Sequence, residues 1–159
     1  GPFIAEVRRV TPSTTGRHHV VELTVRFRNM SQERLILTYR AGTNGAVDEL
    51  GNRYYYGRAG THDGSVKGMG TTTRGGADAR FTLRPGEQRE ATFTVVRFNA
   101  GNRIGSRWAW DAVVEELEVL SSTQVRSTRE HSVGVNDLTA GAGGVGGLLD
   151  AAARAVKKP

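Results

Sequence analysis

The chain of 159 residues contains no cysteine, so it fits one domain and excludes disulfide bonds and thiolate metal sites. A hydrophobic fraction of 37% allows a real core but is low for a helical bundle. The net charge of +6 is spread along the chain, with basic doublets only at Arg8-Arg9 and Lys157-Lys158, which argues against a nucleic-acid partner. No apolar run approaches the ~18 residues of a membrane span.

The first segments alternate apolar and polar residues at every second position, which is the period of a β-strand. Residues 17–29 show this most clearly, and residues 3–10 and 33–40 predict strands in the same way. In residues 17–29 the positions on the apolar side of the alternation are His19, Val21, Leu23, Val25 and Phe27. The opposite parity carries mostly charged residues, so we expect one buried face and one wet face.

Three further strands are predicted at residues 52–57, 79–83 and 90–98. A turn at Leu50-Gly51-Asn52 leads into the first of them. The sequence "RPGE" at residues 84–87 separates the other two, and its proline presets φ while its glycine permits a positive φ. These four residues therefore predict a tight turn.

Residues 107–120 fit either a helix or a strand. A helical stripe is formed by Trp110, Val113, Val114, Leu117 and Leu120. The surrounding segments are β, however, and residues 129–138 could pair with this one. We therefore predict a strand, with a short helical turn near Asp111 as the alternative.

Two segments lack a strand pattern. Residues 57–78 carry seven glycines and do not read as a regular element, so we expect a long loop that is either functional or mobile. Residues 139–159 form a Gly/Ala-rich flexible linker followed by "LLDAAARAVKK", which could form a short helix. Such a helix is too short to be stable alone in water.

About seven short strands with turns between them predict an all-β chain, folded as an antiparallel sandwich over residues 3–138. The two sheets would bury their apolar faces against each other about 10 Å apart. Residues 139–159 would follow as a flexible or short-helical tail.

Three short motifs resemble parts of immunoglobulin-like domains. The stretch "VRFRNMS" resembles a V-x-V-x-N-x-S strand end, and "DELGNRY" resembles a D-x-x-G-N-x-Y hairpin. The stretch "FTLRPGEQREATFTV" resembles a strand–turn–strand unit built on L-x-P-G-E. Together they resemble the immunoglobulin-like β-sandwich domains of uncharacterised bacterial exported proteins and lipoproteins. The resemblance implies a sandwich fold and an envelope or extracellular setting, and it implies no catalytic residues.

The histidines and acids predict no metal site. His18 and His19 are adjacent in a strand, so their side chains point to opposite faces and cannot easily share an ion. Asp63 begins an Asp-Gly-Ser stretch that could offer oxygen ligands to calcium, but Asp-Gly is also ordinary turn chemistry. We keep His62 and Asp63 as candidate binding residues in the glycine-rich loop.

No catalytic residue or cofactor is predicted. The stretch "GMGTTTRGG" lacks the Lys-Ser/Thr pair of a phosphate-binding loop, and no serine stands in a G-x-S-x-G context. Glu115, Glu116 and Glu118 could supply paired carboxylates for glycoside hydrolysis, but the charged wet face of a strand explains them much better. We therefore expect a protein that is not an enzyme.

The aromatic residues are the best functional candidates. Tyr54 and Tyr56 share one strand parity, and Trp108 and Trp110 share another. Exposed, either pair would form a flat platform for a sugar ring or for a partner's apolar side chain. Buried, the same residues would fill the core of the sandwich.

These observations predict a non-catalytic module of a bacterial cell-envelope or secreted protein that acts by protein–protein interaction or in assembly. The alternative is a carbohydrate-binding module that uses the exposed aromatics on a glycan. Gly1-Pro2 resembles the scar of a tag protease, so we expect a missing native N-terminus, through which alone a membrane anchor would act. The setting would be periplasmic or extracellular.

Overall fold

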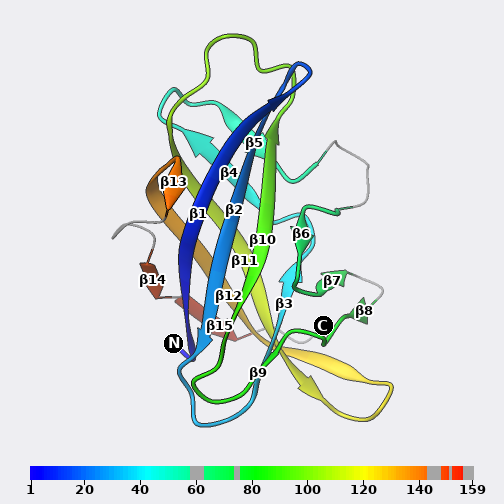
Figure 1. Cartoon of the computed structure of the whole chain (residues 1–159). Coiled ribbons are helices and arrows are strands. Elements are labelled where there is room, and N and C mark those ends of the chain that lie inside the picture. The colour runs from blue at the N-terminus through cyan, green and yellow to red at the C-terminus, as the bar shows by residue number, and fades with distance from the viewer. Residues whose placement is uncertain (58–62, 74–75, 143–147, 151, 156–159) are drawn as a thin grey trace.

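The computed structural model describes residues 1–57, 63–73, 76–142, 148–150 and 152–155 (Figure 1). Every regular element in these ranges is a β-strand, which confirms the all-β prediction, and none of them contains a helix able to cross a membrane. The long strands are β1 (Phe3–Thr15), β2 (His18–Asn29), β3 (Leu35–Arg40), β10 (Gln88–Arg97), β11 (Arg107–Val119) and β12 (Val125–Thr139). The short ones are β4 (Gly45–Asp48), β5 (Arg53–Tyr55), β6 (Val66–Lys67), β7 (Thr71–Thr73), β8 (Gly76–Ala77), β9 (Thr82–Leu83), β13 (Gly141–Ala142), β14 (Leu148–Asp150) and β15 (Ala152–Ala155).

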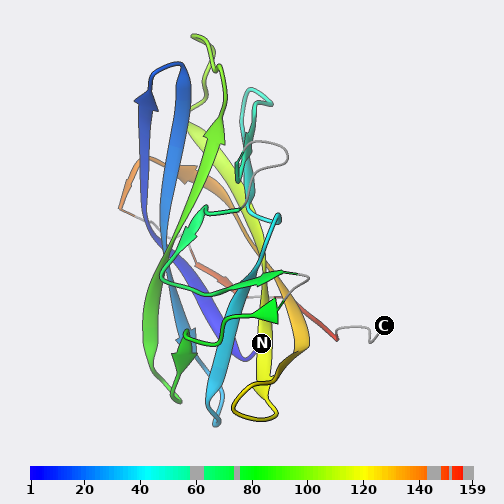
Figure 2. The same cartoon turned by 90° about the vertical axis from the view of Figure 1, so that its right-hand side faces the viewer.

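The long strands lie in two facing layers (Figure 2). One layer consists of β1, β2 and β10, paired antiparallel, and the other consists of β12, β11 and β3, also paired antiparallel. The β4–β5 hairpin joins the layers on one side, because β5 pairs with β10 while β4 pairs with β11. The strand order thus runs continuously from one layer into the other.

Aromatic side chains fill the space between the layers. The Phe93 ring of β10 lies 5.0 Å from the Trp110 ring of β11 and 5.9 Å from the Tyr39 ring of β3. All three side chains are buried, and so are all five residues on the predicted apolar side of residues 17–29. The period-two pattern therefore identified the face of β2 that packs into the core.

The prediction of a strand at residues 107–120 is confirmed, and so is its pairing with residues 129–138. The helix-like spacing matches a change in the buried positions of β11, which pass from even to odd numbers between Val114 and Glu115, both of them buried. The register also shifts here: Glu116 and Leu117 lie opposite Arg129 and Ser127, so the extra residue of the bulge is Thr128 of β12. Val114 and Leu117 are therefore both buried although they are three positions apart, which is the spacing of a helical face.

The turn predicted at residues 84–87 is also confirmed. The Glu87 N–H donates to the Arg84 carbonyl at 2.9 Å, and Gly86 has a φ of 78°. Proline at the second position and a positive φ at the third define a type II turn. This turn closes on β2, because the Gly86 N–H donates to the Asn29 carbonyl at 2.9 Å.

The two segments without a strand pattern contain strands after all. Within residues 57–78, β6 pairs with β10 and β7 runs parallel to β3. The C-terminal segment was expected to be flexible or helical, but β14 pairs with β1 and β15 pairs with β12. Leu, Ala and Arg favour helices, but the segment is short, and the backbone groups at the edges of β1 and β12 provide partners for an extended chain.

Candidate functional site

Three of the four aromatic residues singled out in the sequence are part of the core. Tyr54, Trp108 and Trp110 are each at most 3% exposed, so these three residues cannot form a binding platform on the surface. The Trp110 indole N–H donates to Asn44 Oδ1 at 2.8 Å, and the Tyr54 hydroxyl donates to Asp48 Oδ2 at 3.1 Å. The alternating burial of β5 and β11 turns all three side chains inward, and buried polar partners hold the polar ends of Trp110 and Tyr54.

Asp63 anchors a loop. Its carboxylate accepts hydrogen bonds from the Tyr39 hydroxyl at 2.6 Å and from the Gly42 N–H at 2.7 Å. It also accepts from the backbone and side chain of Ser65. Burial acts to raise the pKa of Asp63, but these hydrogen bonds outweigh burial and hold the pKa below its ordinary value. With its oxygens engaged inside the chain, Asp63 has a structural role, while His62 lies outside the described residues.

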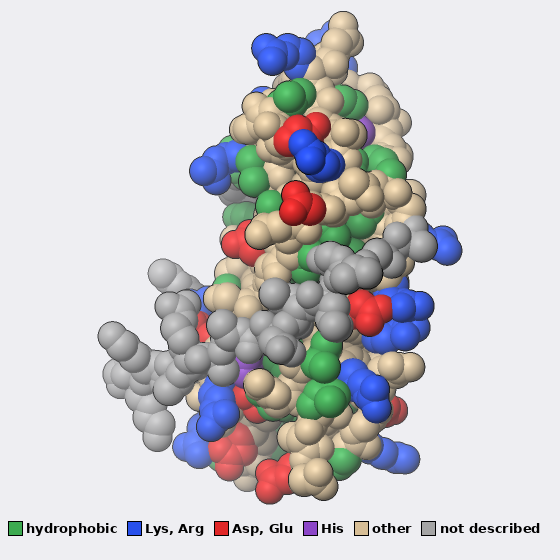
Figure 3. Space-filling view, turned by 90° about the vertical axis from the view of Figure 1, so that its left-hand side faces the viewer, with side chains coloured by type: hydrophobic (Ala, Val, Ile, Leu, Met, Phe, Trp, Pro, Cys, Tyr) green, Lys and Arg blue, Asp and Glu red, His purple; other side chains and the backbone are tan. Residues whose placement is uncertain are grey.

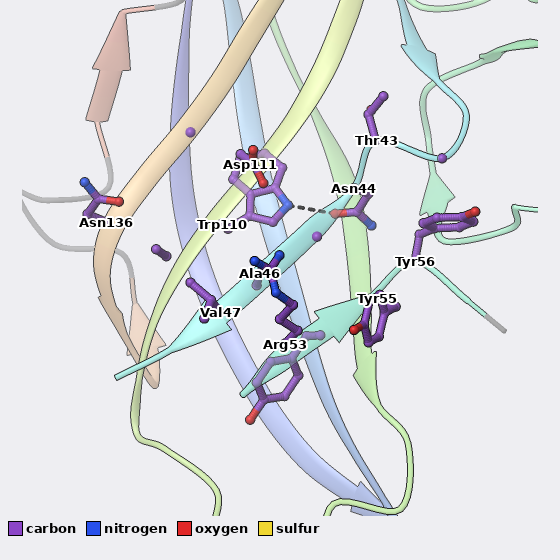
Figure 4. A pocket seen from close by; sticks show the side chains of 15 residues that line it. Thr43, Asn44, Ala46, Val47, Arg53, Tyr55, Tyr56, Trp110, Asp111 and Asn136 are labelled. Atoms are coloured by element: carbon purple, nitrogen blue, oxygen red, sulfur yellow. Dashed lines mark hydrogen bonds between the residues drawn. The ribbon is translucent and has the colours of Figure 1, made fainter. Parts of the chain in front are cut away.

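Tyr56, the fourth aromatic, lines a hollow of about 460 Å³ on the outer face of β4, β5, β11 and β12 (Figure 4). We call it the tyrosine hollow. Its floor is made by small residues, among them Gly45, Ala109 and Gly134. Its rim carries Val47, Arg53, Tyr55, Tyr56, Asp111 and Asn136. Two strand hairpins that are distant in sequence therefore build one concave surface.

The floor is low because two strand-interior positions are glycines. Asp111 of β11 pairs with Gly45 on one side and with Gly134 on the other, so the two glycines flank it in one row across the sheet. Neither glycine needs a positive φ, and a Cβ built on either would find its nearest atoms at 3.4 Å. Alanine would therefore fit both positions. Glycine inside a strand weakens it and often marks a place where another molecule approaches the backbone closely.

The rim combines apolar and polar groups. Tyr55 is 47% exposed and Val47 is 38% exposed, so both offer apolar surface at the rim. Although the Asp111 side chain remains accessible to solvent, neighbouring atoms partly desolvate its carboxyl group and raise its pKa. Arg53 and Asn136 add planar hydrogen-bonding groups. The hollow thus offers an aromatic surface beside charged and amide donors and acceptors.

Buried hydrogen bonds fix the base of the hollow. Asn44 accepts from Trp110 and donates through Nδ2 to Ser65 Oγ and to the Thr94 carbonyl, both at 3.0 Å. The Thr43 hydroxyl accepts from the Val113 N–H at 2.9 Å. This network connects the residues just before β4 with β11 and with β10 on the other side of the core. A partner would meet a surface whose shape is set before binding.

The sequence identified Tyr56 but missed the rest of the rim. Tyr54 and Tyr56 share a parity, yet β5 ends at Tyr55, so Tyr56 does not follow Tyr54 into the core. Tyr55 takes the opposite parity and points outward. The alternation within "RYYY" could have identified Tyr55, whereas Asn136 and Asp111 meet only through the pairing of β11 with β12.

The charged side chains outside the hollow are mixed in sign. On the face shown in Figure 3, Lys and Arg side chains are interspersed with Asp and Glu. Within the described ranges, no group of three or more His, Asp or Glu side chains could hold a metal ion. The tyrosine hollow is therefore the best-defined candidate site on the outer face of the sheet.

No protein-family model matches this chain, and no curated protein and no solved structure matches it.

Proposed function

We propose that the protein is a non-catalytic binding module that contacts a protein partner through the tyrosine hollow. The observation that carries this proposal is the pair of glycines in the floor, at positions where neither backbone geometry nor packing requires glycine. The rim supports it further, because Tyr and Arg are enriched among the residues that dominate the energy of protein interfaces. The fixed network beneath the floor lowers the cost of ordering the surface on binding.

The same proposal includes an immunoglobulin-like sandwich in a bacterial envelope or secreted protein. Two facing antiparallel layers agree with such a fold. The three residues that define the D-x-x-G-N hairpin, Asp48, Gly51 and Asn52, close a hairpin between β4 and β5. Mass spectrometry of the natural protein isolated from its own cells would test the setting, since a processed leader or a lipid is required for an envelope location.

Carbohydrate is the second candidate ligand. It is favoured by the planar groups of Arg53, Asp111 and Asn136, which can bind adjacent hydroxyls on a sugar whose ring lies against Tyr55. The volume of about 460 Å³ is also in the range of small-ligand sites. A protein partner would instead place one or two side chains there and make further contacts around the rim.

A photo-crosslinking amino acid in place of Val47 tests the proposal in the native cell. Val47 lies on the rim and is exposed, and Val119, exposed on a hairpin end, provides the matched control position. We expect a discrete protein adduct from Val47 alone. The adduct should disappear when Gly134→Leu fills the hollow and persist with Gly134→Ala.

Purified protein then separates the two ligand classes. For the crosslinked partner, Tyr55→Ala should weaken binding at least about tenfold, while Val119→Ala should leave it unchanged. A glycan panel that gives Tyr55-dependent binding, with no adduct from Val47, would replace the protein partner with carbohydrate. Equal adducts from both positions, or no binding in either experiment, would refute the proposal.

A further inference from the structure

A second hollow, of about 480 Å³, lies between the β1–β2 turn and the loop that follows β10. We call it the histidine pocket, and its lining includes Arg17, His18, His19, Asn99, Asn102 and Ile104. It shares no lining residue with the tyrosine hollow. His18 and His19 point in different directions, as neighbours in a strand should: His18 contacts Phe98, and His19 turns toward the core. Both nevertheless line the pocket.

His19 is buried without a hydrogen bond. It is 6% exposed, and within the described structure neither Nδ1 nor Nε2 has a partner. Its ring stacks on the Trp108 indole, with ring centres 6.4 Å apart and planes inclined by 29°. Buried polar side chains almost always have a hydrogen-bond partner, so an unpaired imidazole beside a pocket indicates a place for a ligand.

Two more unpaired donors lie next to this histidine. Arg97 is the register partner of His19 on β10, and its Nε–H has no acceptor among the described residues. The Trp108 indole N–H faces the Tyr54 hydroxyl but makes no hydrogen bond of good geometry either. The buried side chains of His19 and Trp108 and the half-buried side chain of Arg97 therefore place buried N–H groups without well-formed hydrogen bonds in one corner of the fold.

The nearest carboxylate cannot supply the missing acceptor. Asp48 attracts His19 electrostatically, but its two oxygens already accept five hydrogen bonds, from Leu50, Asn52, Tyr54 and Gly105. Burial nevertheless outweighs this attraction and lowers the pKa of His19. The Ser13 carbonyl also lies near the ring and acts to raise this pKa, but neither nitrogen of His19 reaches it with hydrogen-bond geometry, which leaves the imidazole available to an acceptor from outside the chain.

Folding does not explain a histidine at this position. The same parity of β2 continues with Val21, Leu23, Val25 and Phe27, all buried in the apolar core. A phenylalanine in place of His19 would stack on Trp108 without leaving ring nitrogens unpaired. The choice of histidine is therefore one that the core itself does not require.

We propose that the histidine pocket binds a small organic carboxylate. The carboxylate accepts a hydrogen bond from the His19 imidazole, and Arg17 at the wall adds a positive charge and a planar guanidinium that matches a carboxylate. The apolar part of the ligand lies against Ile104 and Ala100. A pocket of about 480 Å³ suits a small organic molecule, whereas a bare inorganic anion would leave most of it unfilled.

The test is a titration of the whole chain with benzoate, acetate, benzamide and inorganic phosphate, followed by calorimetry and by NMR of the tryptophan indole N–H signals. The chain has two tryptophans, and Trp108→Phe assigns the signals. We expect saturable binding of benzoate with a shift of the Trp108 signal. Benzamide should bind at least about tenfold more weakly, because it lacks the charge.

Variants show whether the binding uses this pocket. His19→Phe should keep the fold and lower benzoate affinity at least about tenfold, and His19→Gln, which keeps a donor, should recover part of it. Tyr55→Ala should change nothing, so this proposal can fail or succeed independently of the tyrosine hollow. The inference is overturned if benzamide binds as well as benzoate, if phosphate alone binds, if His19→Phe binds normally, or if no probe binds the folded chain.

Discussion

Replacing Asp48 by alanine should be one of the most damaging single changes in this chain. The side chain is 4% exposed, and its two oxygens accept five hydrogen bonds at 2.8–3.1 Å. Two of the donors, the Tyr54 hydroxyl and the Gly105 N–H, are fully buried. They come from the β4–β5 hairpin and from the loop before β11, so one carboxylate holds both segments together.

The magnitude follows from the donors that would lose their acceptor. A buried donor left unpaired costs about 1–3 kcal/mol, so the two buried donors together predict a loss of about 4 kcal/mol in the free energy of unfolding. The other three donors are closer to solvent and can turn to water at lower cost. For a chain of this length the loss corresponds to a decrease in melting temperature of about 10 °C.

Urea denaturation followed by tryptophan fluorescence and circular dichroism measures this loss. The matched control is Asp111→Ala, because Asp111 is an exposed aspartate on the neighbouring strand β11 and should change stability by less than about 0.5 kcal/mol. A loss below about 1 kcal/mol for Asp48→Ala, with an unchanged denaturant slope, would refute the account of Asp48 as a buried anchor.

Three further substitutions should alter stability for similar physical reasons. Gly105→Ala should lower the free energy of unfolding by about 2 kcal/mol, because the new Cβ would lie 2.6 Å from the Asp48 Cβ. A loss under about 0.5 kcal/mol in urea denaturation would show that the loop moves aside freely. Trp110→Phe should lower the free energy of unfolding by about 2 kcal/mol, because Asn44 Oδ1 loses its buried donor. An unchanged melting temperature would contradict this prediction. The folded-state pKa of Asp63 is lowered, so its stabilisation is complete above about pH 4 and is lost as the pH falls through the folded-state pKa. Melting curves of Asp63→Asn should therefore depend less on pH below about pH 4 than those of the unchanged chain, and parallel curves would contradict the assignment.

The sequence predicted the long strands because burial on one face imposes a period of two. It did not predict β4, because "GAVD" contains too few alternating residues to stand out beside the glycines around it. It also suggested a helix near Val114 and Leu117, where the buried positions of β11 change from even to odd numbers so that both residues are buried. Patterns of this length report local geometry, whereas bulges and edge pairing depend on the neighbouring strand.

The candidate site was harder to predict than the fold for a related reason. The parity of Tyr54, Trp108 and Trp110 was visible in the sequence, but parity alone does not say which of the two faces is buried. The structure places these residues inward and leaves Tyr55 outside. The rim of the hollow depends on the register between β11 and β12, which no single segment of the sequence contains.

Each of the two hollows contains a residue whose identity the fold does not require. Gly134 occupies a strand interior with an ordinary φ, and His19 interrupts an apolar row with unpaired nitrogens. If these residues are retained for binding, substitutions that suit the fold should separate stability from binding. Gly134→Val should raise the free energy of unfolding by about 1 kcal/mol, because valine favours a strand and its side chain fills the hollow. His19→Phe should be neutral or stabilising, because it removes two unpaired buried nitrogens.

Denaturation curves and binding assays on the same two proteins provide the comparison. We expect Gly134→Val to lose the partner of the tyrosine hollow while still binding benzoate, and His19→Phe to show the reverse. Val119→Ala, at an exposed hairpin position, is the control that should alter neither property. If either substitution lowers stability by more than about 1 kcal/mol, the residue is required by the fold, and its identity no longer indicates a binding site.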